Sequence, residues 1–340
     1  MSSSFATQLS SAPTSALAVQ VRPGKPPLLQ VDATEDASRW VSEHRDALRA
    51  AVVEQGALLV RGLGLRDMAE VAAVFHRLGS LMTEREAFAA RQRYADDLYS
   101  SSKWPPSQPM CMHHELSYAL EFPSLMLFAC LAAPAEGGAT PLADAASVLQ
   151  ALPSELLERF ERVGWLLIRN YNGEIGASIA DAFGSDDRRA VESYCQANAI
   201  RFEWQPGGGL RTWQRRSAIV RHPRTGQRCW FNQIAFLNKW TIEAEVREYL
   251  VDIYGEDGLP FDTHFGNGDP IGPDIVQLLN EIYEANTTRD RWQSGDLMLV
   301  DNIRTAHGRE RFKGPREVLV GMADAVSLVD CSPTIEVTGG

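Results

Sequence analysis

The sequence lacks several features that would place it in a class of protein at once. No apolar run approaches the roughly 20 residues that a membrane-spanning helix requires. The 340 residues carry a net charge of -11, so the basic excess typical of polyphosphate binders is missing. We therefore expect no membrane and no nucleic acid among its partners. An acidic chain can still bind a small anion, because one buried arginine can hold a carboxylate.

Cysteine is scarce, and it follows no metal-binding or disulfide pattern. The five cysteines are an odd number, and no two form a C-x-x-C pair. This usage argues against a disulfide framework and against a zinc knot. The start of the chain also lacks the apolar centre of a secretion signal. We therefore predict reduced thiols in a cytoplasmic protein.

Motifs for nucleotide binding and for serine hydrolysis are missing as well. The "GGG" at 207–209 lacks the strand-turn-helix context of a dinucleotide fingerprint. Ser117 has histidines nearby but no nucleophile elbow around it. Neither stretch predicts an active site.

The order of elements predicts the fold class. Residues 1–27 are rich in Ser, Ala and Pro and predict a disordered tail, whereas 28–340 show no composition break and predict one domain. Helices and strands do not alternate regularly, which argues against a doubly wound parallel sheet. Short strands gather after about residue 110 and predict a mainly β fold with flanking helices, a double-stranded β-helix or jelly roll. Helical patterns cover 36–56, 67–79, 153–164, 185–199, 243–255 and 273–286; strand-like runs cover 57–63, 125–131, 165–171, 217–223, 229–236, 296–302 and 317–323.

One short stretch, "CMHHELSY" at 111–118, contains candidate metal ligands. In an extended chain His113 and Glu115 point to the same face, because residues two apart share a side. By itself this pair is more typical of a packed core than of a metal site. The late block "WQSGDLMLVDNIRTAHGRERFKGPREVLVGMAD" adds His307 just past an apolar strand. A His-x-carboxylate pair and one distant histidine make up the 2-His-1-carboxylate triad, which suits non-haem Fe(II).

The same block offers a cation for a cosubstrate. The open positions of such a triad can take a bidentate 2-oxo acid and O2. The far carboxylate of that acid needs a fixed cation, for which the planar fork of arginine is well suited. Arg316 opens the next predicted strand and is the candidate.

With "GALLVRGL" and "GGATPLAD", these blocks resemble the taurine dioxygenase (TauD/TfdA-like) family of Fe(II)/2-oxoglutarate-dependent oxygenases, closest to the syringomycin-pathway (SyrP-like) type. The resemblance covers about residues 50–325. It implies a jelly roll in which His113, Glu115 and His307 bind iron. It also implies that three further residues serve 2-oxoglutarate: Arg316 pairs with its distal carboxylate, Thr140 supports that carboxylate, and Trp292 lines the pocket.

Two assignments stay open within the resemblance. The spacing from His307 to Arg316 is shorter than in taurine dioxygenase, so Arg309 and Arg311 compete with Arg316. The middle residue of the His-x-Glu motif is commonly Asn in the closest relatives, and here it is His114. We prefer His113 as the ligand, because adjacent side chains on a strand face opposite ways.

The implied activity is hydroxylation of an unactivated C–H bond with Fe(II), 2-oxoglutarate and O2. The substrate implied is an amino acid or an amino-acid-derived small molecule of specialised metabolism, free or presented by a carrier protein. Glu115 stands where related halogenases have a small residue, which favours hydroxylation over halogenation. Desaturation, epoxidation and oxidation of a small sulfonate or carboxylate would use the same ligands. A jelly roll that binds without turnover is the non-enzymatic alternative, and the oligomeric state is left open.

Overall fold

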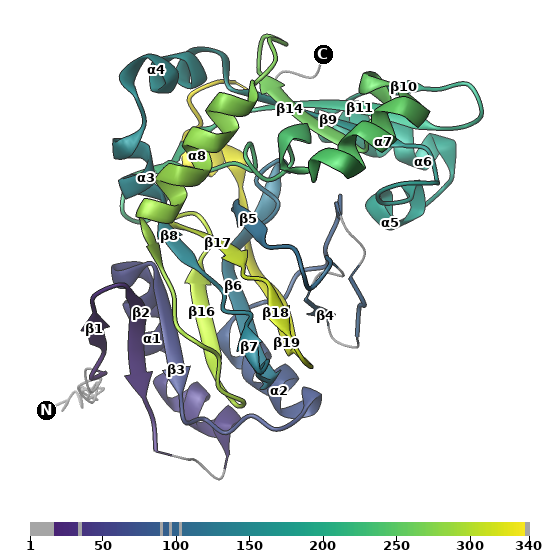
Figure 1. The fold of residues 1–340 in the computed structure, drawn as a ribbon. Helices are drawn as coiled ribbons and strands as arrows, with labels where there is room; N and C mark the ends of the chain where they lie inside the picture. The colour runs from purple at the N-terminus through teal and green to yellow at the C-terminus, as the bar shows by residue number, and fades with distance from the viewer. Residues whose placement is uncertain (1–16, 33–35, 89–90, 95–96, 102–103, 337–340) are drawn as a thin grey trace, which may run out of the picture.

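A seven-stranded sheet and a facing four-stranded sheet form the centre of the molecule (Figure 1). The structure, a computed structural model, describes residues 17–32, 36–88, 91–94, 97–101 and 104–336. The larger sheet has the order β1 (Gln20–Arg22), β2 (Lys25–Gln30), β3 (Ala57–Arg61), β16 (Leu297–Asp301), β6 (Glu121–Ala132), β19 (Glu317–Ser327) and β4 (Leu98–Ser100). The smaller sheet has the order β15 (Thr287–Thr288), β8 (Leu142–Asp144), β17 (Thr305–Arg309) and β5 (Met110–His113).

The two sheets enclose the main core. Buried side chains from both meet there, among them Met112 and Leu142 of the smaller sheet and Met298 and Val320 of the larger one. The rings of Phe128 on β6 and His307 on β17 lie 5.2 Å apart between centroids. This double-sheet arrangement confirms the predicted mainly β jelly roll.

Two N-terminal helices cover the outer face of the larger sheet. Helix α1 (Ala37–Gln55) begins at Asp36, whose side chain accepts a hydrogen bond from the Arg39 N–H, and ends at Gly56 with φ 81°. With α2 (Met68–Leu78) it buries a second apolar cluster against β3, β6 and β16. Because both of its faces are covered, β6 is buried along most of its length.

A separate four-stranded sheet stands at one end of the molecule, at the top of Figure 1. Its order is β10 (Arg201–Trp204), β11 (Leu210–Arg216), β9 (Trp165–Tyr171) and β14 (Phe261–Phe265). Residues of α5 (Ile179–Phe183) and α6 (Arg188–Ala197) pack against β9 and β11 in a third apolar cluster. The remaining elements are α3 (Ala145–Ala151), α4 (Ser154–Val163), α7 (Ala244–Tyr254), α8 (Pro273–Ala285), η2 (Lys239–Thr241), η3 (Glu256–Gly258), η4 (Leu328–Cys331), the pair β12 (Ile219–Arg221) and β13 (Arg228–Trp230), and the pair β7 (Glu136–Gly137) and β18 (Phe312–Lys313).

All six helices expected from periodicity are present, as α1, α2, α4, α6, α7 and α8. The short helices α3 and α5 were not predicted. The strand expected over 229–236 ends at Trp230. Beyond it, the side chain of Asn232 accepts a hydrogen bond from the Ile234 N–H and turns the chain.

The predicted disordered tail was wrong over residues 20–27, which belong to a hairpin. Strands β1 and β2 form a hairpin around Gly24, and β2 also pairs with β3. Leu28 and Leu29 bury their side chains, and Arg22 forms a 2.9 Å ion pair with Asp290. The hairpin thus extends the edge of the sheet, which the local Ser, Ala and Pro content does not indicate. Residues 1–16 lie outside the described residues.

Two expectations from composition, on membrane spans and on cysteines, can be compared with the described residues. None of the helices described is both long and apolar enough to cross a bilayer. All five cysteines are unpaired thiols, as expected from their spacing.

Candidate metal centre and cofactor pocket

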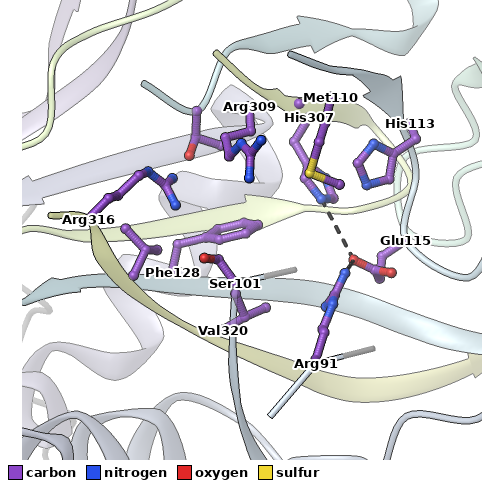
Figure 2. Close-up of a pocket in the computed structure, with 13 residues that line it drawn as sticks. Arg91, Ser101, Met110, His113, Glu115, Phe128, His307, Arg309, Arg316 and Val320 are labelled. Atoms are coloured by element: carbon purple, nitrogen blue, oxygen red, sulfur yellow. Dashed lines mark hydrogen bonds and ion pairs between the residues drawn. The ribbon is translucent and has the colours of Figure 1, made fainter. Parts of the chain in front are cut away.

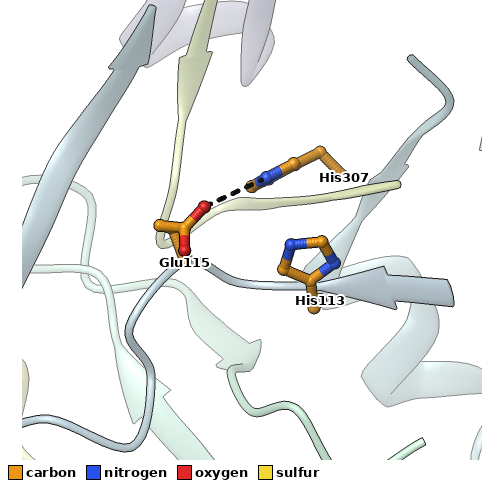
Figure 3. A group of neighbouring side chains, drawn as sticks. All are labelled: His113, Glu115 and His307. Atoms are coloured by element: carbon orange, nitrogen blue, oxygen red, sulfur yellow. Dashed lines mark ion pairs between the residues drawn. The ribbon is translucent and has the colours of Figure 1, made fainter. Parts of the chain in front are cut away.

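Two paired strands and the turn after one of them bring His113, Glu115 and His307 together (Figure 3). His113 is the last residue of β5, and its Cα lies opposite that of His307 on β17. Glu115 follows two residues later. The Asn302 side chain fixes its backbone, accepting from the Glu115 N–H at 2.8 Å and donating to the Glu115 carbonyl at 3.0 Å. One ligand atom from each of the three side chains lies within 4.8 Å of the others.

The chemical state of these side chains fits a metal site. The three residues are only 2%, 2% and 4% exposed. Burial lowers the pKa of His113 and holds the pKa of His307 well below its usual range, so both imidazoles are neutral donors. Burial opposes ionisation of Glu115, but the charge of Arg91 and its hydrogen bond to the carboxylate favour it, and the pKa of that carboxyl is lowered.

The hydrogen-bonding pattern leaves ligand atoms free for an ion. His113 Nδ1 lies 2.9 Å from the Cys111 carbonyl, which fixes Nε2 as the bare nitrogen. His113 Nε2 is buried, and no described residue is its hydrogen-bond partner. His307 Nε2 lies 3.8 Å from Glu115 Oε2, too far for a hydrogen bond. Buried polar atoms without partners are rare, and a cation between these three groups would satisfy them.

His114 faces the opposite side, as strand alternation predicts. Its Nδ1 lies 2.5 Å from the Asn302 carbonyl, and its ring packs 4.9 Å from that of Phe231. It does not belong to the cluster of metal-ligating groups. The geometry therefore favours His113 over His114 as the metal ligand.

A cavity adjoins the cluster and reaches Thr140 and Arg316. Figure 2 shows Arg316 at the end away from Glu115. The apolar wall of the cavity is formed by Phe128, Val318 and Val320. Apolar walls around few polar groups exclude water from a reactive site.

The far end of the cavity has a cation and a hydroxyl. Arg316 donates from Nε to the Gly138 carbonyl at 3.0 Å, while its buried Nη1 has no partner among the described residues. Burial, together with the charge of Arg309, lowers the pKa of Arg316 to about 10, so it stays charged at neutral pH. The Trp292 indole N–H donates to Thr140 Oγ1 at 3.2 Å. Trp292 is not among the residues that line the cavity, but its indole reaches the lining residue Thr140.

The two competing arginines have other surroundings. Arg309 lines the cavity, but it donates to the carbonyls of Trp104, Pro105 and Gln108 at 2.7 to 2.9 Å and so holds that loop in place. Arg311 is exposed. Arg309 thus has only Nε without a partner, whereas Arg316 has a terminal nitrogen, Nη1, unpaired among the described residues, which favours Arg316 as the cation for a carboxylate at this end.

Among the cavity residues that sequence reasoning missed, Arg91 is the charged one. Its side chain is 5% exposed, and Nη2 donates to Glu115 Oε2 at 2.9 Å. Arg91 lies in a stretch without helix or strand periodicity, between residues that carry no motif. No pattern in the sequence distinguishes it from the other arginines.

The jelly roll, the buried two-histidine, one-carboxylate cluster and the cationic far end together define a non-haem iron oxygenase that uses a 2-oxo acid. The chain belongs to the TauD/TfdA family: the model of the "Taurine catabolism dioxygenase TauD, TfdA family" matches residues 20–323. It is therefore an Fe(II)- and 2-oxoglutarate-dependent oxygenase, as the resemblance in the sequence implied.

Relatives support this assignment. The chain is 33% identical over 313 residues to the dapdiamide synthesis protein DdaC of Enterobacter agglomerans, covering 90% of this chain and 94% of that protein. It is 26% identical over 297 residues to a clavaminate synthase-like protein of Arabidopsis thaliana, covering 84% and 86%.

Solved structures support the fold. PvcB of Pseudomonas aeruginosa, an Fe, alpha-ketoglutarate dependent oxygenase from an isonitrile synthetic pathway, superposes with a TM-score of 0.50 at 17% identity, covering 90% of this chain and 89% of that one. A Burkholderia xenovorans protein assigned to the alpha-ketoglutarate-dependent taurine dioxygenases gives 0.52 at 16% identity, covering 92% and 98%.

Proposed function

We propose that His113, Glu115 and His307 bind Fe(II), and that the enzyme hydroxylates an unactivated C–H bond of an amino acid or an amino-acid-derived small molecule in the synthesis of a specialised metabolite. The observation that carries the proposal is one cavity with a metal-ligating cluster at one end and a buried, partly unpaired arginine at the other. The name of DdaC, a synthesis protein covered over nearly its full length, supports a biosynthetic role.

Each residue has a stated task in this proposal. The neutral imidazoles and the ionised Glu115 provide the three protein ligands. Arg316 pairs with the distal carboxylate of 2-oxoglutarate, and Thr140, oriented by Trp292, donates its hydroxyl to the same group. Bound Fe(II) with 2-oxoglutarate supplies the oxidation of a C–H bond by O2, with succinate and CO2 as coproducts. Glu115 occupies the ligand position that a halogenase leaves to chloride, which favours hydroxylation.

Anaerobic titration with Fe(II) and 2-oxoglutarate tests the binding part. We expect a weak visible charge-transfer band that requires both components. Zn(II) in place of Fe(II) serves as the control, because it fills the site without giving the band. A protein that gives no band with Fe(II) and 2-oxoglutarate would contradict the assignment.

A second assay tests the reaction. Succinate release is measured with amino acids, peptides and carrier-bound acyl groups, and products are examined by mass spectrometry. Hydroxylation adds one oxygen atom, whereas desaturation removes two hydrogens. A product that has lost two hydrogens and gained no oxygen would identify the reaction as desaturation and contradict hydroxylation.

A further inference from the structure

Arg91 is a buried cation at the metal end of the cavity, and its hydrogen bonds are incomplete. It lines the cavity, and Figure 2 shows it beside Glu115, away from Arg316. Only Nη2 has a hydrogen-bond partner, Glu115 Oε2 at 2.9 Å. Nε and both N–H bonds of Nη1 are buried without an acceptor in the part of the chain that the structure describes.

The surroundings do not complete these bonds. Glu84 is the second carboxyl nearby, but its Oε1 lies 3.9 Å from Arg91 Nε, beyond hydrogen-bonding range. Glu115 is shared with the metal site. A buried guanidinium with unsatisfied donors is costly, because it loses hydration without compensation. A polar ligand in the cavity would remove that cost.

The charges along the cavity favour an anion. Arg91, Arg309 and Arg316 line it, against the single carboxylate of Glu115. The two terminal nitrogens of Arg309 are occupied by three backbone carbonyls, which leaves only its Nε without a partner, and Arg316 is assigned to 2-oxoglutarate. Arg91 is the cation bonded to Glu115, and two of its nitrogens have no partner among the described residues.

Glu86 and Ala87, a few residues before Arg91, are held by hydrogen bonds from the separate sheet and from α6. Arg169 donates to the carbonyls of Glu86 and Ala87 at 2.8 and 2.6 Å. The Glu86 carboxyl accepts from Tyr194 at 3.0 Å and from Gln214 at 2.5 Å.

We propose that Arg91 binds a free carboxylate of the substrate next to the metal centre. This inference rests on the proposed function and names its substrate class, a small molecule with an unesterified acid group close to the oxidised carbon. It favours a free acid over an acyl group tethered to a carrier through that same carboxyl, because a thioester has no negative charge to pair with Arg91.

A purely structural role is the alternative. Arg91 would then serve only to neutralise and orient Glu115. The two roles differ in what they predict for a neutral ligand: a structural arginine affects acids and neutral analogues alike, whereas a recognition arginine discriminates between them.

The test compares the common L-amino acids with their primary α-amides, under two readouts. Anaerobically, each compound is added to the Fe(II)–2-oxoglutarate complex, and the shift of the charge-transfer band is titrated. In air, succinate release is measured. We expect one or more acids to respond about 10- to 100-fold more strongly than the matching amides, which is the range of one charge-assisted hydrogen-bonded pair. This comparison in the unmodified protein needs no variant to fold.

Variants then assign the preference to Arg91. In Arg91→Gln the acid response should fall to the level of the amide, and Arg91→Lys should restore part of it. Arg93→Gln, an exposed arginine paired with Asp97, is the matched control and should keep the preference.

The contrary results are distinct. Three results would overturn the inference and leave the proposed function intact. The first is an equal response to acids and amides, and the second is an equal loss of both responses in Arg91→Gln. The third is an Fe(II)–2-oxoglutarate complex whose band none of the acids shifts. Loss of the Fe(II)–2-oxoglutarate band in Arg91→Gln alone would assign Arg91 to positioning Glu115. Absence of the band in the unmodified protein would instead overturn the proposed function.

Discussion

The cavity has two parts that are held in place differently. His113 and His307 lie opposite each other on paired strands, and Arg316 immediately precedes β19. Arg91 lies outside the strands: Glu86 before it is held by side chains of the separate sheet and of α6, and Arg93 after it forms a single bridge to Tyr99 of β4. The two histidines of the proposed metal site thus rely on strand pairing, whereas the proposed substrate-binding residue does not. The first suits a fixed reaction, and the second suits a specificity that can change by loop substitutions.

The largest effect is expected in the strand-built part of the cavity, which contains His113, His307 and Arg316. His307→Ala removes a metal ligand from a buried cluster, and loss of even an outer partner of a metal ligand costs about 10- to 100-fold. We therefore expect succinate formation to fall by more than about 100-fold and the Fe(II)–2-oxoglutarate band to vanish. The fold should persist, because the substitution leaves the strand backbone unchanged.

His264→Ala is the matched control for that experiment. His264 lies on β14 in the separate sheet and contacts Asp262 and Gly268, far along the chain from the metal ligands. This variant should retain the band and its turnover. Succinate formation at the original rate in the His307 variant would contradict the ligand assignment.

The next prediction distinguishes Arg316 from Arg311, two of the arginines that follow His307. Arg316→Leu removes the buried cation at the far end of the cavity, so the KM for 2-oxoglutarate should rise about 10- to 100-fold. Arg311→Leu, on the exposed neighbouring stretch, should leave it unchanged. Steady-state kinetics with varied 2-oxoglutarate measure both, and a larger effect in the Arg311 variant would reverse the assignment.

The strand-built part was accessible to sequence reasoning because its residues follow a period or a motif. The order and separation of the motifs that contain His113, Glu115 and His307 carried the resemblance, although Glu115 lies in a turn and not on an extended chain. Trp292 was expected to line the pocket, and its indole is hydrogen-bonded to the lining residue Thr140.

The loop-built part, which contains Glu86 and Arg91, could not be predicted in the same way. Arg91 and Glu86 lie in a segment without periodicity, and the side chains that bond to Glu86 come from residues 83 to 128 positions away. Such contacts depend on how the separate sheet packs, which no local pattern records. The hairpin of β1 and β2 was missed for a similar reason, since its pairing with β3 brings together distant residues.

A hydrogen bond in the loop-built part provides the third prediction. Tyr194→Phe removes the hydroxyl that donates to Glu86 and should cost about 1 to 2 kcal/mol of unfolding free energy. Urea unfolding measures it, with the exposed Tyr249→Phe as a control expected to change little. The Fe(II)–2-oxoglutarate band should be unaffected. A weakened band would show that the two parts are not independent.

The smallest effect concerns the hydrogen bond behind the strand-built part. Trp292→Phe removes the indole N–H that orients the Thr140 hydroxyl. A neutral hydrogen bond contributes about 1 kcal/mol, so the KM for 2-oxoglutarate should rise about fivefold. Thr140→Val removes the other partner, and the double variant should be no worse than the worse single one, because both changes break the same interaction. Trp240→Phe, whose ring stacks with Arg247 away from the cavity lining, is the control. Additive effects of the first two substitutions would mean that Trp292 contacts the cosubstrate by another route, as the sequence resemblance first implied.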